Sequence, residues 1–277
     1  MESLVLLIAS EDVKGLVAGV SSILFRHDCN IIENGEFVDR AKGRFFMRTA
    51  FEGDIDREKL YAEILAALPA GAHARLMTRR KKRIAILATK EAHCLGDLLV
   101  RCDFDDLNAE IATVIANHDF LRDLTEKFNK PFHHVGAEGL SREQHEQAVL
   151  NALEEYRFDY VVMAKYMRIL TPGFIQAFPQ RIINIHHSFL PAFIGANPYR
   201  QAYERGVKTI GATAHFASVD LDEGPIIAQG TIPVDHSHSA RDMARFGRDV
   251  EKTVLARALD LVFDDRVFVH GNRTIVL

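Results

Sequence analysis

The chain has 277 residues, 48% of them hydrophobic and 26% charged, which is typical of a globular protein and leaves room for two domains. Its formal net charge of −4 argues against a nucleic-acid partner. The apolar run at the N-terminus is too short to cross a membrane and lacks the features of a signal peptide. Three cysteines without a CxxC pair indicate a reducing, cytoplasmic compartment and neither a disulfide framework nor a zinc site.

Residues 1–78 alternate between strand and helix patterns. Strands are expected where the run is apolar or β-rich, and helices where apolar residues recur at helical spacing. In chain order these segments are strand 4–8, helix 15–27, strands 29–38 and 44–51, helix 56–68 and strand 72–78. The order βαββα(β) predicts a ferredoxin-like domain. The basic run that follows, residues 79–83, indicates a solvated linker.

Residues 84–277 show a different pattern, in which short apolar strands alternate with helices. Strands are expected at 83–89, 110–116, 132–135, 160–164, 181–185, 209–216 and 225–234. Helices are expected at 95–102, 120–128 and 141–156, from 172, from 198, and at 240–263, before a hairpin of 267–270 and 274–276. Ser141 and Gln144 form a capping box. This alternation predicts a doubly wound, Rossmann-like α/β sheet.

Two polar residues stand at the end of the buried strand 181–185. Side chains two apart in a strand point to the same side, so Asn184 and His186 project together and His187 faces away. Ligands of open α/β sheets bind outside the carboxyl ends of the strands. An amide can donate to a developing oxyanion, and an imidazole can exchange protons beside it. The pair therefore predicts a catalytic site, although a satisfied polar pair at a strand end is the simpler alternative.

A second polar group follows the strand 209–216. His215 lies on that strand, and Asp222 lies in the acidic loop after it, where a carboxylate can polarise a water and orient an imidazole. The flanking acids Asp220 and Glu223 fit a solvated turn. No metal site is expected, because neither the pair 133–134 nor the histidines at 236 and 238 have a third spaced ligand.

Residues 181–230 resemble the formyltransferases that use 10-formyltetrahydrofolate, and the similarity covers about residues 83–270. It implies that Asn184, His186 and Asp222 are catalytic and that His215 is a further active-site residue. The run 163–170 resembles the pterin-binding loop of that family. The resemblance therefore implies that this loop binds the substrate through Met167, Arg168, Ile169 and Leu170. No cofactor is implied, since the folate is the substrate.

The acceptor of the formyl group is predicted from the segment after strand 83–89. Transferases to phosphorylated amines carry a glycine-rich phosphate loop there. This chain has Glu91 and a single glycine, Gly96, so no docking site for a second organic substrate is expected. The segment resembles formyltetrahydrofolate deformylases, as do the doubled His186-His187 and residues 269–274. Hydrolysis to formate and tetrahydrofolate is then implied, in one-carbon metabolism and purine biosynthesis. The alternatives are a formyltransferase to an amine and a non-catalytic folate- or amino-acid-binding regulator.

Residues 1–78 resemble an ACT-type regulatory domain, the module that heads those deformylases. The usual Pro-Gly pair before the first helix is reduced here to Gly15. The resemblance implies control by a small amino acid such as glycine or methionine. It also implies a homo-oligomer, with a tetramer favoured, because ACT domains commonly pair across subunits.

Overall fold

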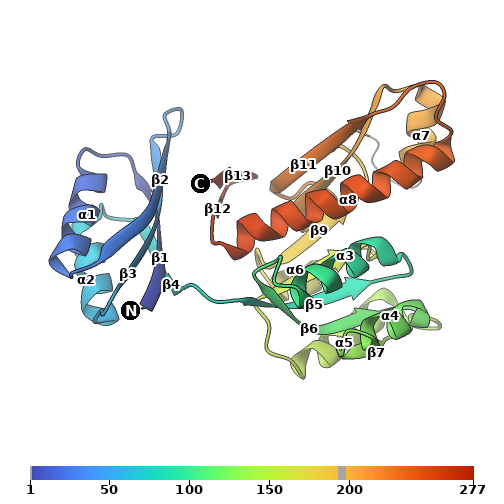
Figure 1. Cartoon of the computed structure of the whole chain (residues 1–277), viewed down its shortest axis with the longest axis horizontal. Helices are drawn as coiled ribbons and strands as arrows, with labels where there is room; N and C mark the ends of the chain where they lie inside the picture. The colour runs from blue at the N-terminus through green and yellow to red at the C-terminus, as the bar shows by residue number, and fades with distance from the viewer. Residues whose placement is uncertain (1, 193–197) are drawn as a thin grey trace. The chain divides into compact units, whose positions relative to one another are not determined.

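The computed structural model describes residues 2–192 and 198–277 and divides into two compact units. The first unit comprises Met1–Arg80, Asp264–Phe268 and Ile275–Leu277, and the second comprises Lys81–Phe263 and Val269–Thr274 (Figure 1). The first break falls inside the expected linker. The C-terminal boundary differs from the expectation, because eight of the last fourteen residues pack with the first unit. Among the described residues, no helix is long and apolar enough to cross a membrane.

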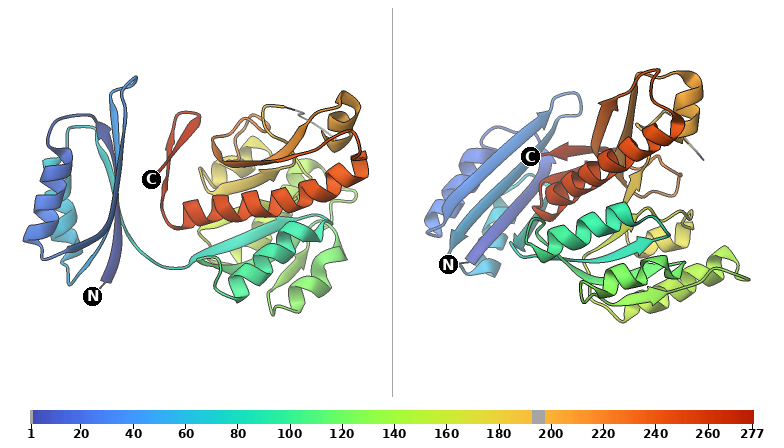
Figure 2. Two further views of the ribbon diagram at one scale, coloured as in Figure 1. Left: turned by 45° about the horizontal axis from the view of Figure 1, so that its top comes forward. Right: turned by 45° about the vertical axis from the view of Figure 1, so that its right-hand side comes forward.

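The first unit has the predicted ferredoxin-like order of elements. These are β1 (Glu2–Glu11), α1 (Leu16–Arg26), β2 (Asn30–Asp39), β3 (Arg44–Gly53), α2 (Arg57–Ala67) and β4 (His73–Thr78). The strands form one antiparallel sheet in the order β2-β3-β1-β4. Both helices cover the same face of this sheet (Figure 2).

Strand β1 is buried on both faces, which explains its continuous apolar run. Leu4 and Leu6 point into the core beneath the helices. The alternate residues Val5 and Leu7 point to the opposite face, where they pack with Phe268 from the C-terminal segment. An apolar side chain buried in this way contributes about 1.5–3 kcal/mol. The C-terminal residues therefore belong with this unit because they cover an apolar sheet face.

The second unit is a mixed α/β structure with a seven-stranded sheet, as predicted. Its elements are β5 (Lys82–Ala88), α3 (Ala92–Asp103), β6 (Ala109–Ala116), η1 (Asp119–Leu121), α4 (Arg122–Glu126), β7 (Phe132–His134), α5 (Arg142–Glu154), β8 (Tyr160–Ala164), α6 (Pro172–Ala177), β9 (Ile182–His186), α7 (Pro198–Arg205), β10 (Thr209–Phe216), β11 (Ile226–Pro233) and α8 (Ala240–Phe263). The order is β11-β10-β9-β8-β5-β6-β7, and β10 runs antiparallel to both of its neighbours while the other pairs are parallel. A hairpin of β12 (Val267–His270) and β13 (Arg273–Val276) ends the chain.

Two helical segments test the sequence patterns. The capping box of α5 is confirmed, since Ser141 Oγ accepts from Gln144 N at 3.2 Å and Gln144 Oε1 accepts from Ser141 N at 2.9 Å. The helix expected at 120–128 is found in shortened form, because it starts as the 3₁₀ turn η1 and α4 ends at Glu126.

The order of winding fixes where the sheet can bind ligands. The chain runs from β5 outward to β6 and β7, then returns to β8 on the other side of β5. Ligands of open α/β sheets bind at such a switch point, beyond the carboxyl ends of the strands. Here the two strand ends are joined by a hydrogen bond from Met167 N to Thr89 Oγ1 of 2.9 Å. Helix α8 runs beside β10 and β11 (Figure 2).

Candidate active site

Strands β9 and β10 bring three polar side chains together. They pair antiparallel, with Asn184 opposite His215 and His186 opposite Thr213. Directly opposite residues share a face of the sheet, so His215 joins the predicted pair Asn184 and His186. The register of β10 against β11 shifts between Ala214 and His215. Irregularities of this kind re-aim a side chain and are common beside active sites.

The loop between β10 and β11 adds the carboxylate. Asp220 and Glu223 are exposed, as expected of a solvated turn, whereas the side chain of Asp222 is only 8% exposed. Asp222 has φ 59, a left-handed conformation that is strained for a residue with a Cβ. A Cβ at Gly224 would lie 1.8 Å from the carbonyl oxygen of Phe216, so glycine is required for this close approach.

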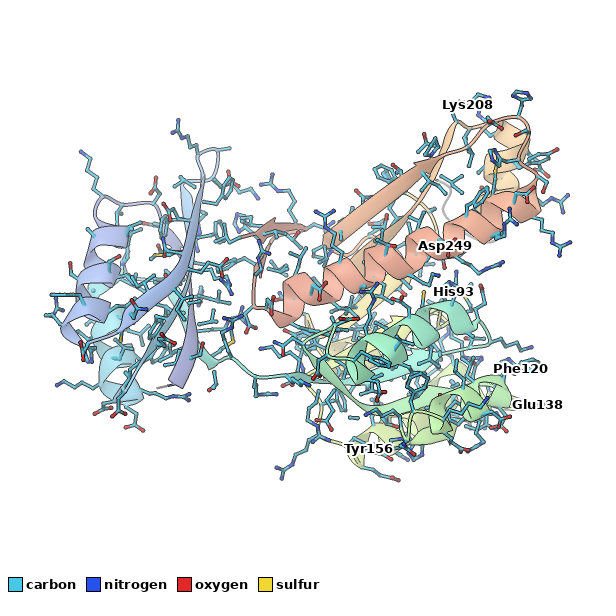
Figure 3. The ribbon with its side chains drawn as sticks, viewed as in Figure 1. His93, Phe120, Glu138, Tyr156, Lys208 and Asp249 are labelled. Carbon is cyan, nitrogen blue, oxygen red and sulfur yellow. The ribbon has the colours of Figure 1, made fainter. Side chains whose placement is uncertain are left out.

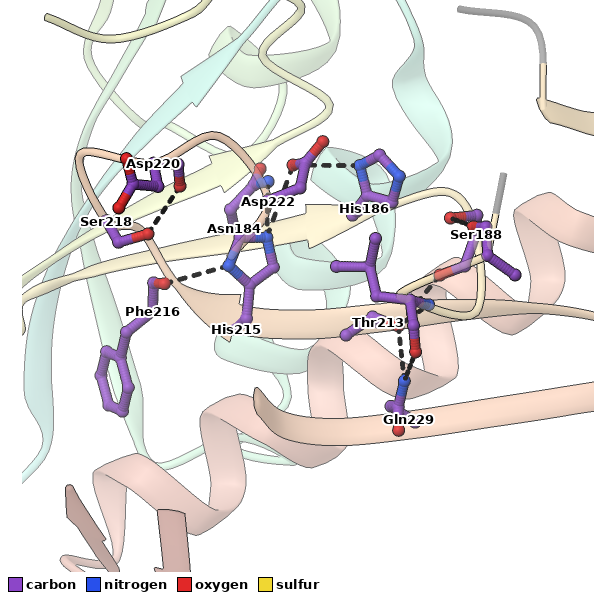
Figure 4. A network of polar contacts seen from close by, with 12 residues as sticks. Asn184, His186, Ser188, Thr213, His215, Phe216, Ser218, Asp220, Asp222 and Gln229 are labelled. Atoms are coloured by element: carbon purple, nitrogen blue, oxygen red, sulfur yellow. Dashed lines mark hydrogen bonds and ion pairs between the residues drawn. The ribbon is translucent and has the colours of Figure 1, made fainter. Parts of the chain in front are cut away.

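Four side chains form one polar network (Figure 4). His186 Nδ1 lies 3.2 Å from Asp222 Oδ1, and His215 Nε2 lies 3.8 Å from the same oxygen. Asn184 Nδ2 lies 3.2 Å from His215 Nε2. The structure thus links Asn184, His215, Asp222 and His186, in that order, by a series of contacts.

The backbone fixes the proton on His215. Its Nδ1 lies 3.0 Å from the carbonyl oxygen of Phe216, which can only accept, so Nδ1 carries the hydrogen. Burial lowers the pKa of His215, which favours the neutral ring. In that ring Nε2 is an acceptor, and Asn184 Nδ2 donates to it. The amide of Asn184 is therefore held in one orientation, with its second N–H left for a ligand.

His186 and Asp222 form the charged half of the network. Burial alone would raise the pKa of Asp222, but the hydrogen bond and the charge interaction with His186 lower it overall. His186 Nδ1 donates to this carboxylate. His186 Nε2 is buried and has no hydrogen-bond partner among the described residues. A buried polar atom without a partner is costly, so this nitrogen is placed to meet a ligand.

The expected pterin-binding segment lines a pocket beside the network. Arg168, Ile169 and Leu170 face Asn184, His215 and Asp222 across a narrow cavity of about 40 Å³. Other residues complete the lining: Met163, Ile175, Ala217, Ser218, Val219 and Leu221. Met167, also expected to bind substrate, is 56% exposed and lines a neighbouring pocket instead.

The sequence patterns did not reveal a second buried cluster, around Glu251 of α8. Its Oε2 lies 3.2 Å from Lys165 Nζ and 2.8 Å from His93 Nε2, and its Oε1 accepts from the Tyr199 hydroxyl at 2.5 Å. Burial opposes ionisation, but the hydrogen bond from His93 and the charge of Lys165 bring the pKa of Glu251 down to about 2. Lys165 has φ 62, a second strained residue at the strand ends.

A pocket of about 680 Å³ opens beside this cluster, and its lining includes Glu91, Lys165 and Tyr199. The segment after β5 therefore borders an open pocket, and the expectation that no second organic substrate docks there stays a prediction. Glu91 does not fill that space, because its carboxylate turns toward His93 and Lys165, at 3.6 and 3.9 Å. Figure 3 shows His93 on α3, on the side of that helix that faces α8.

One group of potential metal ligands occurs among the described residues. His93, Cys94 and Glu251 offer ligand atoms within 4.8 Å of one another. Lys165 already neutralises Glu251, and burial raises the pKa of the Cys94 thiol, which disfavours the thiolate that metals require. The donor set therefore suits a buried ion pair better than a cation. The histidines at 133, 134, 236 and 238 belong to no such group within the described part of the chain.

Comparison with known proteins gives a consistent result. The formyl transferase family model matches residues 82–259. A formyltetrahydrofolate deformylase of Escherichia coli (strain K12) is 58% identical over 96% of this chain and 95% of its own length. The structure of a formyltetrahydrofolate deformylase from Pseudomonas syringae pv. tomato has a TM-score of 0.95 and 42% identity, covering 100% of this chain and 95% of that one. Glycinamide ribonucleotide transformylase 1 from Symbiobacterium toebii covers only 71% of this chain and 94% of its own, with a TM-score of 0.68 and 33% identity. This chain therefore belongs to the formyl transferase family and, within it, to the formyltetrahydrofolate deformylases.

Proposed function

We propose that this protein hydrolyses 10-formyltetrahydrofolate to formate and tetrahydrofolate. The observation that carries the proposal is the buried, unpartnered Nε2 of His186 beside the oriented amide of Asn184. The likeness to deformylases over nearly the whole chain supports water as the acceptor. The likeness to glycinamide ribonucleotide transformylase 1 of Symbiobacterium toebii, in contrast, is confined to 71% of the chain.

Hydrolysis of a formamide passes through a tetrahedral oxyanion. The free N–H of Asn184 and the protonated Nε2 of His186 donate to this oxygen, and a donor of this kind contributes roughly 10²–10³ in rate. The carboxylate of Asp222 stabilises the imidazolium through Nδ1. His186 protonates N10 as the C–N bond breaks, either directly or through a bridging water.

Asp222 also acts on the attacking water. The hydrogen bond from His186 uses Oδ1, which leaves Oδ2 to accept from a water. Because its pKa is lowered, the carboxylate is ionised at neutral pH and can hold and help deprotonate that water. No other acidic side chain of the loop is buried.

The pterin ring is expected in the pocket beside Arg168, held by backbone groups of residues 167–170. The cavity of about 40 Å³ is narrow for a bicyclic ring. Val219 and Leu221 are about half exposed at its rim, where a change of side-chain rotamer would widen the pocket for the substrate.

The test is to supply 10-formyltetrahydrofolate without any amine and to measure formate. Rapid formate release is expected, and transfer to an added amine without formate would favour the transferase alternative. Asp222→Asn should abolish turnover and leave folate binding largely intact. A protein that binds folate but never releases formate would instead be a regulator.

For the first unit we propose an ACT-type regulatory role, with glycine or methionine as effector. A cavity of about 360 Å³ lies beside Gly15, which precedes α1 without a side-chain cap, so free backbone N–H groups could meet a carboxylate. A homo-oligomer, with a tetramer favoured, and a cytoplasmic location belong to the same proposal. An unchanged hydrolysis rate at saturating glycine and methionine would remove the regulatory role.

A further inference from the structure

The 680 Å³ pocket beside Glu251 carries an excess of positive charge. Four cationic side chains line it against two acidic ones: Lys165, Arg200, Arg241 and Arg248 against Glu91 and Glu251. It opens at the carboxyl end of β8, next to the switch point where ligands of this sheet type bind. Its function is not explained by the folate pocket, which lies around Arg168 and Asp222.

Two of the arginines are free to meet an anion. Lys165 is committed to Glu251, and Arg200 is paired with Glu204 at 2.8 Å. Arg241 and Arg248 make no ion pair with any residue in 2–192 or 198–277. They stand seven residues apart on α8, which places them on the same face of the helix. Cations without partners around a hollow raise the local concentration of anions.

His187 connects this pocket to the catalytic network. Its ring lies 5.1 Å from that of His186, measured between centroids, and it also lines the cationic pocket. Burial, followed by the charge of Lys165, lowers the pKa of His187 to about 4, so the ring is neutral at pH 7. The boundary between the two sites is thus a neutral aromatic ring that adds no charge of its own.

The product of the proposed reaction needs a route away from Asp222. Formate is an anion, and it would form beside this ionised carboxylate, which repels it. The narrow folate pocket remains filled while tetrahydrofolate is bound. On the other side of His187 the lining is cationic and the space is wide.

We propose that the pocket lined by Lys165, His187, Arg241 and Arg248 is an anion port, which binds formate and releases it before tetrahydrofolate leaves. This inference rests on the proposed hydrolysis. The ligand of this pocket belongs to the class of small carboxylates. The width of the pocket and the exposure of its arginines make the binding weak and exchange fast.

Product inhibition tests the order of release. Formate, compared with chloride at equal ionic strength, should inhibit noncompetitively against 10-formyltetrahydrofolate, whereas tetrahydrofolate should inhibit competitively. The double variant Arg241→Gln/Arg248→Gln should raise the inhibition constant for formate about tenfold, since two charge-assisted contacts are lost. Arg245→Gln is the matched control on the same helix, because Arg245 is paired with Asp242 and lies outside the pocket. Competitive inhibition by formate against 10-formyltetrahydrofolate would contradict the proposal of an anion port.

A binding measurement separates this inference from the proposed function. Carbon-13 formate is followed by NMR line broadening on the full chain saturated with tetrahydrofolate, where no turnover occurs. Broadening in the wild type and in Arg245→Gln, with loss in the double variant, supports the port even if no hydrolysis is found. Broadening that persists in the double variant contradicts it, and so does broadening that appears only when tetrahydrofolate is left out.

Discussion

At the scale of single residues, the tautomer of His215 determines what Asn184 can do. With Nδ1 bound to the carbonyl of Phe216, Nε2 accepts from Asn184 and aims its other N–H at the substrate. His215→Leu should therefore lower kcat by about 10- to 100-fold, less than the 10²–10³ expected for deleting a donor. Steady-state kinetics with 10-formyltetrahydrofolate measures this effect, and KM should change much less than kcat.

His215→Gln is the rescue variant for this positioning role. A glutamine carbonyl can accept from Asn184 in place of Nε2, so much of the lost kcat should return. If the leucine and glutamine variants are equally slow, His215 does not act through Asn184.

Gly224 sets the position of Asp222. Gly224→Ala places a Cβ against the carbonyl of Phe216, where only backbone movement relieves the clash. A shift of about 1 Å in a catalytic group can cost about 10²-fold in rate, so a loss of this order in kcat is expected. Gly96→Ala in α3 is the control, because its nearest contact would be an ordinary 3.8 Å. Equal activity of both variants would show that the loop does not fix the carboxylate.

The catalytic residues differ in how far the sequence reveals them. Strand alternation was enough to pair Asn184 with His186, because it is a local rule. The approach of Asp222 depends on a loop that no local rule places, so only the family resemblance predicted it. Lys165 and Glu251 were not predicted, since a buried charge depends on a partner distant in sequence. A Glu within the apolar stripe of the helix 240–263 was the available signal.

At the scale of elements, the stability of the fold around α8 depends on a charged side chain that this helix buries. Glu251 is fully buried and pairs with Lys165, which is 4% exposed. Glu251→Gln removes the charge and leaves the ammonium group poorly compensated. The free energy of unfolding should fall by about 3–5 kcal/mol in urea at pH 7. In the double variant Lys165→Met/Glu251→Gln the loss should be smaller, because no unpaired charge remains. If the double variant loses as much free energy of unfolding as the two single variants lose together, the destabilisation does not come from an unpaired charge.

The same carboxylate makes stability depend on pH. Its folded pKa, about 2, lies below the ordinary value of 4.5, so the unfolded chain binds more protons between these limits. The contribution is complete above about pH 4.5 and is lost as the pH falls toward 2. Between pH 5 and pH 3 the wild type should therefore lose more unfolding free energy than Glu251→Gln, as measured by urea titration. Parallel losses in both proteins would assign the acid sensitivity to other groups.

Helices and strands were predicted best where a single hydrophobic periodicity dominates the segment. The long helix α8 and strand β10 have the bounds that the hydrophobic pattern gave. Strand β1 is longer than its apolar run, because pairing with β3 continues into polar residues at both ends. The helix expected at 120–128 is present but shorter, since it begins as a 3₁₀ turn and ends at Glu126.

At the scale of the whole molecule, the sequence could not show that the last residues return to the first unit. The hairpin signal around Gly271 is local, whereas its partners on β1 and β3 lie more than 200 residues earlier. The segments 264–268 and 275–277 belong to the first unit, and 269–274 to the second. The chain therefore passes between the units more than once, and a linker at residues 79–83 does not alone separate two independent domains.

Phe268 provides the test of this organisation. It is 6% exposed and packs edge-to-face on Phe46, with centroids 5.5 Å apart. Phe268→Ala should destabilise the first unit by about 3–5 kcal/mol, although the residue lies almost at the end of the chain. Hydrogen exchange followed by mass spectrometry should show faster exchange in β1 and β3 and little change in β5 and β8. Val276→Ala, at a position 41% exposed, is the control and should alter neither set. Faster exchange confined to the second unit would assign the C-terminal segment to that unit instead.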